Sequence, residues 1–153
     1  MPDNDKCTLF RIIAQIIPWI LVVFGWLIVN KQNNIREKRK EIRSILNQLL
    51  EELDSTEKLA ISYHSAEKQL IELGRDIKLS LSRIGKSVNR HDLLPRGQRY
   101  PIAKFRQAIT LKNFDTEDFI TQKVNSDLIN EISATKDDLT DALERQFQDN
   151  YQK

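Results

Sequence analysis

An apolar run near the N-terminus constrains this 153-residue chain more than any other feature of its sequence. Residues 12–29 read IIAQIIPWILVVFGWLIV and give about 27 Å of helix at about 1.5 Å per residue. Leu9 and Phe10 extend that length to roughly 31 Å, which matches the hydrocarbon core of a bilayer. The sequence therefore predicts a transmembrane helix over residues 9–30, preceded by a short external N-terminus, residues 1–8.

The flanks of the run predict an uncleaved anchor with a defined orientation. A secretory signal has a basic start and small residues at its cleavage site, whereas this chain begins MPDNDK and leaves the run through Asn30. Lys and Arg beside a span are retained in the cytoplasm, and six of them follow the run. We therefore expect a single-pass membrane protein with its N-terminus outside and its C-terminal domain cytoplasmic. The cations expected at the membrane interface, against the lipid bilayer, are Lys31, Arg36, Lys38, Arg39, Lys40 and Arg43.

Beyond these cations, apolar residues recur at alternating spacings of four and three. The row comprises Ile42, Leu46, Leu49, Leu53, Ala60, Tyr63, Leu70, Ile77, Leu81, Ile84 and Val88, and it misses at Thr56, Glu67 and Gly74. Such a heptad seam predicts one long amphipathic, coiled-coil-like helix over residues 31–88. Leu46, Leu49, Leu53, Leu70, Ile77 and Leu81 are expected to form either the core or an oligomer seam. A second apolar row beside the first favours an antiparallel bundle over a slim two-stranded coil.

The sequence DSTE at residues 54–57 resembles a helix start, so a kink near 54–56 is the alternative to a straight helix.

Two prolines and a glycine predict a loop over residues 89–100, after which Pro101 suits the first turn of a new helix. Residues 101–153 are expected to form shorter return helices that pack on the long helix. Asp115 or Thr116 would cap one of them, Ile120 and Val124 would join its apolar stripe, and the helix could restart at Thr135. The predicted fold class is all-α: one N-terminal transmembrane helix, one long helix, and antiparallel return helices.

Several kinds of chemistry lack the residues that they need. Cys7 is the only cysteine, which excludes an internal disulfide and a thiolate metal cluster. His64 and His91 have no convergent ligands or nucleophile at workable spacing, and the four glycines form no phosphate-binding fingerprint. We therefore expect no enzyme, and no catalytic, cofactor-binding or metal-binding residue.

The stretch 73–106 is the best candidate for a binding surface, because it holds nine Lys and Arg against two Asp and Glu. The candidate residues of this interaction surface are Arg96, Arg99, Tyr100, Arg106, Gln107 and Thr110. Such a patch could meet nucleic acid, but no recognised motif accompanies it and the acidic return segment can neutralise it. Nucleic acid is therefore not the expected partner. A polar cluster that fixes one helix to another is the structural alternative for Arg106, Gln107 and Thr110.

The segment FRQAIT at 105–110, followed by Phe114 and Asp115, is the least generic part of the chain. Together with the apolar run, the exit NKQNNIREKRKEIR and the series Leu143, Phe147 and Tyr151, it resembles a group of uncharacterised bacterial single-pass inner-membrane proteins. In these, one span precedes a helical cytoplasmic domain with an Arg-Gln-Ala-hydrophobic-Thr segment. The resemblance implies this architecture and a location in the bacterial inner membrane, and it implies no activity.

These observations predict a membrane-anchored helical scaffold or adaptor that acts through protein contacts. Its partner would be a second copy or another protein, bound through the heptad helix. Two alternatives remain open: a membrane effector or sensor of a defence or stress system that works by oligomerisation, and a basic membrane tether for nucleic acid.

Overall fold

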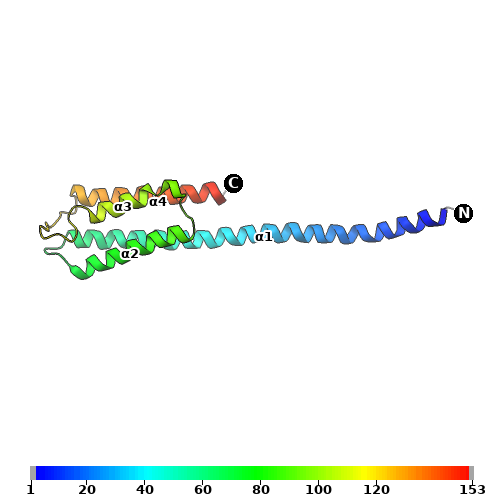
Figure 1. Ribbon diagram of the computed structural model, residues 1–153, viewed down its shortest axis with the longest axis horizontal. Helices are drawn as coiled ribbons and strands as arrows, with labels where there is room; N and C mark the ends of the chain where they lie inside the picture. Colours follow the sequence, from blue (N-terminus) through cyan, green and yellow to red (C-terminus); the bar gives the residue numbers. More distant parts are fainter. Residues whose placement is uncertain (1–2, 152–153) are drawn as a thin grey trace. The chain divides into compact units, whose positions relative to one another are not determined.

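The computed structural model describes the backbone of residues 3–151, and side chains from residue 15 onward with 16, 17, 96, 152 and 153 excepted. Its helices are α1 (Asp3–His64), α2 (Ile71–Arg90), α3 (Tyr100–Thr110) and α4 (Asp127–Tyr151), with a short 3-10 turn at Arg96–Gln98 (Figure 1). The described residues contain no strand, so the all-α prediction is confirmed. The chain forms two units, Met1–Glu41 and Ile42–Lys153.

The heptad seam is buried in α1 from Ile42 to Tyr63, as its spacing predicts. Leu46, Leu49 and Leu53 are each 2% exposed or less. Thr56, a polar residue in the seam, is also fully buried, and its hydroxyl donates a 2.7 Å hydrogen bond to the Glu52 carbonyl one turn earlier. The helix continues through residues 54–56, so DSTE does not start a new helix there, and the alternative of a kink stays a prediction.

The prediction of one helix over residues 31–88 is wrong, because the chain turns back between α1 and α2. The turn occupies residues 65–70, where the sequence has neither glycine nor proline. Gly74 then lets α2 pass close to the end of α1: a Cβ built there would lie 3.4 Å from the Tyr63 ring. The seam resumes in phase on α2 with Ile77, Ile84 and Val88 buried, which is why spacing alone does not reveal the turn.

The return path also differs from the prediction, because residues 111–126 form no helix. Asp115 has a positive φ of 54°, and the Thr116 hydroxyl accepts a local hydrogen bond from the Asp118 amide. Helix α4 begins at Asp127 instead, with the Ser126 hydroxyl accepting from the Ile129 amide, and it runs through Thr135 without a restart.

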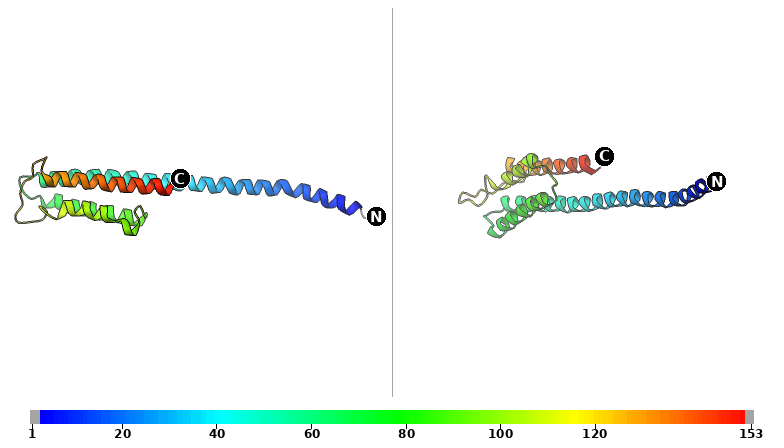
Figure 2. Two further views of the ribbon diagram at one scale, coloured as in Figure 1. Left: turned by 90° about the horizontal axis from the view of Figure 1, so that it is seen from above. Right: turned by 45° about the vertical axis from the view of Figure 1, so that its right-hand side comes forward.

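Within the unit Ile42–Lys153 the four helices form an up-and-down bundle. Two perpendicular views place each helix beside its neighbours in the sequence and place α4 beside α1 (Figures 1 and 2). Ion pairs fix the antiparallel register: Arg43 of α1 lies 2.6 Å from Glu144, and Lys136 of α4 lies 3.1 Å from Asp54. The core draws on all four helices and includes Leu46, Leu53, Ile77, Ile84, Phe105, Ile109, Ile132, Leu139 and Leu143.

Because the bundle closes within one chain, the predicted seam residues serve as its core. Leu46, Leu49, Leu53 and Ile77 are buried, and Leu81 is a partly buried residue packed against them. Leu70 lies at the start of α2 and is half-buried. Four of these six positions are therefore buried inside the bundle, and the other two are covered only in part.

The predicted transmembrane helix is not supported: no helix in the part of the chain that the structure describes is long and apolar enough to cross a membrane. The side chains of Gln15 and residues 18–30 of this predicted span are among those that the structure describes. The other side chains of residues 9–17 lie outside the described residues. This finding contradicts the predicted single-pass inner-membrane localisation, which we do not retain.

Candidate interaction surfaces

Residues 19–29 of α1 present the largest set of exposed apolar side chains among the described residues. Ten large apolar side chains in these eleven positions are each 49–73% exposed, with Trp19 the most and Ile20 the least. Consecutive residues of a helix point in directions about 100° apart, so this segment is apolar on every side. We call it the apolar segment, residues 19–29.

The predicted interface cations follow the apolar segment directly. Lys31, Arg36, Lys38, Arg39 and Lys40 are all exposed, whereas Arg43 is half-buried and pairs with Glu144. The Arg43 guanidinium also lies over the Phe147 ring, 5.4 Å from its centroid. Arg43 thus holds the bundle together, and its predicted role at a membrane interface is not supported.

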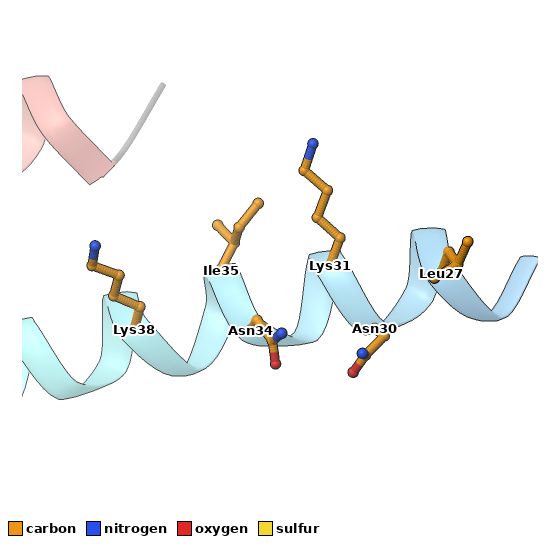
Figure 3. A pocket seen from close by; sticks show the side chains of 6 residues that line it. All are labelled: Leu27, Asn30, Lys31, Asn34, Ile35 and Lys38. Atoms are coloured by element: carbon orange, nitrogen blue, oxygen red, sulfur yellow. The ribbon is translucent and has the colours of Figure 1, made fainter. Parts of the chain in front are cut away.

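A shallow surface pocket of about 530 Å³ lies on α1 between Leu27 and Lys38. It is lined by Leu27, Asn30, Lys31, Asn34, Ile35 and Lys38. Figure 3 shows Lys31, Ile35 and Lys38 projecting from the same side of the helix. Lys31 and Lys38 are seven residues apart and therefore lie along the same side of Ile35.

The predicted surface around the loop is brought together only in part. Tyr100 is 68% exposed at the start of α3, and Gln107 lies two turns further along the same helix. Both line a groove between α3 and α4. Arg99 is half-buried before the helix, and its Nε is buried without a hydrogen-bond partner in the described structure. The side chain of Arg96 lies outside the described residues.

The groove between α3 and α4 contains two open pockets of about 290 and 340 Å³. Lys104 and Asp138 line both pockets, and their charged groups lie 3.8 Å apart. The cation is thereby partly neutralised by the acidic return helix. Lys78 is similarly paired, with Asp115 at 2.5 Å. These are two of the nine cations between residues 73 and 106, and the described residues show no ion pair for the others, so the expected neutralisation inside the chain is only partial.

The sequence allowed Arg106, Gln107 and Thr110 to be a polar cluster that fixes one helix to another. The structure does not show such a cluster at Arg106 and Thr110. Both lie on α3, where the Thr110 hydroxyl donates a 2.9 Å hydrogen bond to the Arg106 carbonyl one turn earlier. Arg106 itself is exposed. The segment's packing comes instead from its apolar members, since Phe105 and Ile109 are almost completely buried.

A buried polar network that the sequence did not predict closes one end of the bundle. His64 is fully buried at the end of α1, and its Nε2 lies 3.1 Å from the Ile109 carbonyl, so Nε2 carries the proton and donates. Its Nδ1 accepts from the Asn113 amide at 3.3 Å. Asn113 in turn pairs with both the N–H and the carbonyl of Ile120, each at 2.8 Å.

Burial lowers the pKa of His64 below its ordinary value of 6.5, and the hydrogen bond with Ile109 opposes that shift only in part. The neutral imidazole is therefore the form that fits the network. No sequence spacing could have revealed it, because His64 and Asn113 are brought together only by the return of the chain.

Comparisons of this chain with protein families, with curated proteins and with solved structures gave no match. The resemblance to single-pass inner-membrane proteins gains no support from them. The function is therefore argued from these surfaces alone.

Proposed function

We propose that this protein is a helical scaffold or adaptor that acts through protein contacts, and that its copies associate through the apolar segment, residues 19–29. The observation that supports the proposal is the exposure of ten large apolar side chains in that segment. The bundle, by contrast, covers its own apolar seam within one chain. The contact surface consequently lies in α1 before residue 42.

The size of the apolar surface favours an assembly of several chains. Full burial of one large apolar side chain contributes roughly 1.5–3 kcal/mol. These side chains are already partly covered by the helix itself, so about 1 kcal/mol each is a reasonable scale, or on the order of 10 kcal/mol for the segment. That is comparable with the 4–15 kcal/mol that association is estimated to cost. A pair of helices would cover only one side of each, so we expect at least three copies.

The test is the size of the intact chain in solution, measured by analytical ultracentrifugation and by crosslinking in cells. Both tryptophans, Trp19 and Trp26, lie in the apolar segment, so a blue-shifted fluorescence maximum reports its burial. We expect an oligomer with blue-shifted fluorescence. The double variant Leu21→Gln/Ile28→Gln should dissociate it and shift the emission to the red, because two amides would enter an apolar contact without partners.

The matched control is Leu79→Gln/Leu111→Gln, which makes the same change at two exposed apolar positions of the bundle unit. This control should leave the oligomer intact. A monomeric wild-type chain, or an oligomer that survives the first double variant, would overturn the proposal. Binding of the monomer to neutral lipid vesicles, in place of a second copy, would overturn it as well.

A further inference from the structure

We propose that the face of α1 around Ile35 is a docking site for an acidic amphipathic helix of a partner protein. The inference rests on the proposed scaffold function and adds the chemistry of the partner. We call this face the basic docking face; it comprises Lys31, Ile35, Lys38 and Arg39.

Ile35 is the first observation that points to a helix partner. It is the only apolar residue between 30 and 41, and it is 59% exposed. Ile28 lies seven residues before it and Ile42 seven residues after it, so Ile35 keeps the phase of the seam that is buried in the bundle. A repeat of seven is the spacing with which one helix packs lengthwise on another.

The distribution of charge around Ile35 is the second observation. At about 100° per residue, Lys31, Lys38 and Arg39 fall within about 60° of Ile35, on both sides of it. The two acids of the segment, Glu37 and Glu41, fall about 120° or more away. Figure 3 shows Lys31 and Lys38 on the same side as Ile35. Among the described residues, no ion pair involves a cation between 31 and 40.

These features favour an acidic helix over three other occupants of the face: a second copy of the chain, a lipid surface and nucleic acid. A second copy that used the same face would bring Lys31 and Lys38 against like charges, which is unfavourable. A helix that lies on a lipid surface shows an apolar stripe at least about 100° wide, whereas Ile35 is the single apolar residue of the stretch 31–40. Nucleic acid would be bound through phosphates and would not need the exposed isoleucine.

The experiment measures binding of fluorescently labelled helical peptides to the intact chain by anisotropy. One peptide carries leucine at heptad core positions and glutamate at the flanking positions; the other has the same leucines with lysine at the flanks. We expect saturable binding of the acidic peptide, weakened by salt, and none of the basic peptide. Binding of both peptides, or of neither, would overturn the proposal.

Two charge-reversal variants locate the site. Lys31→Glu/Lys38→Glu alters the basic docking face, and Arg36→Glu/Lys40→Glu makes the same change in charge about 100° and 140° away from Ile35. The first variant should weaken binding of the acidic peptide at least about tenfold, and the second should weaken it less than about threefold. Ile35→Gln should weaken it as well, without changing the charge.

Equal losses of peptide binding in the two double variants would mean that the net charge of the segment alone attracts the peptide. This result would overturn the proposed docking face. So would preferential binding of anionic vesicles or duplex DNA over the acidic peptide. The oligomer size of every variant, measured in parallel, separates this inference from the proposed function: a monomer that still binds the peptide contradicts only the assembly, and an oligomer that does not bind contradicts only the docking face.

Discussion

The residues up to Glu41 and the unit Ile42–Lys153 use the same heptad spacing with opposite results. Ile35 and Ile42 are seven residues apart on one helix, yet Ile35 is 59% exposed and Ile42 is 9% exposed. Every described side chain before Ile42 is exposed, whereas the seam from Ile42 onward is covered by α2, α3 and α4. The spacing thus specifies which face of the helix packs against other helices. Whether that face is buried within the chain depends on whether other helices of the same chain lie against it.

Truncating a leucine on each side of this boundary should give the largest difference. Leu53 is fully buried and Leu21 is 66% exposed. Leu53→Ala should lower the free energy of unfolding of the bundle by about 3 kcal/mol, because it leaves a cavity in the core. Leu21→Ala should change it by less than about 0.5 kcal/mol. Hydrogen exchange of the bundle amides measures both, separately from any change in oligomer size.

Equal losses of protection in Leu53→Ala and Leu21→Ala would contradict this difference between the two parts of the chain. They would mean that the bundle depends on the apolar segment for its stability, so that the two units do not fold independently.

The sequence predicted the bundle's buried faces well and its connections poorly. Thr56, Glu67 and Gly74 all interrupt the heptad row in the sequence, but the structure places them in three different environments. Thr56 stays in the core because its hydroxyl bonds to Glu52, Glu67 lies in the turn, and Gly74 allows a close approach to Tyr63. Only the packed chain distinguishes these cases.

The helix start at α4 was misplaced for a related reason. Asp, Ser and Thr favour both helix caps and local turns, since the same side-chain oxygens serve either. Asp115 and Thr116 form a turn, whereas Ser126 is the residue that caps. Ile120 and Val124, which would have continued the apolar stripe, are 65% and 69% exposed. Of the candidate surface, the sequence found exposed Tyr100, Arg106 and Gln107 but not the His64 network, which depends on contacts between distant segments.

An intermediate effect is expected from acidification, and it should be confined to the bundle. The pKa of His64 is lowered in the folded state, so below about pH 6.5 the unfolded chain takes up a proton more readily than the folded one. Stability should therefore fall as the pH drops from 7 to 5. Protonation of Nδ1 would also place a donor against the Asn113 amide, so protection of the amides against hydrogen exchange, relative to their intrinsic rate at each pH, should fall first around residues 109–122.

His64→Gln should flatten this pH dependence, whatever its effect at pH 7, while His91→Gln should preserve it. A slope that persists in His64→Gln would assign the titration elsewhere. Because residues 19–41 contain no histidine, the protection of their amides, relative to the intrinsic exchange rate at each pH, should stay unchanged over the same range.

The smallest effect is expected from two lysines that differ in their surroundings. Lys136 Nζ lies 3.1 Å from Asp54, 3.5 Å from Glu57 and 3.2 Å from Asp137. Burial lowers its pKa, but the hydrogen bonds with Asp54 and Asp137 and the charge of Glu57 raise it by more, so the net shift is upward. Lys38 is exposed, and no acid pairs with it among the described residues.

Lys136→Gln should therefore destabilise the bundle by about 1 kcal/mol, and Lys38→Gln should have no measurable effect in denaturant unfolding. Because the Lys136 side chain is only 18% exposed, 1 M salt should reduce its contribution without removing it. Loss of the whole effect in salt would show that Lys136 acts as a surface charge and not as a link between α4 and α1. A measurable loss from Lys38→Gln, in contrast, would mean that residues before Glu41 also contribute to the bundle's stability, which the exposure of every described side chain there argues against.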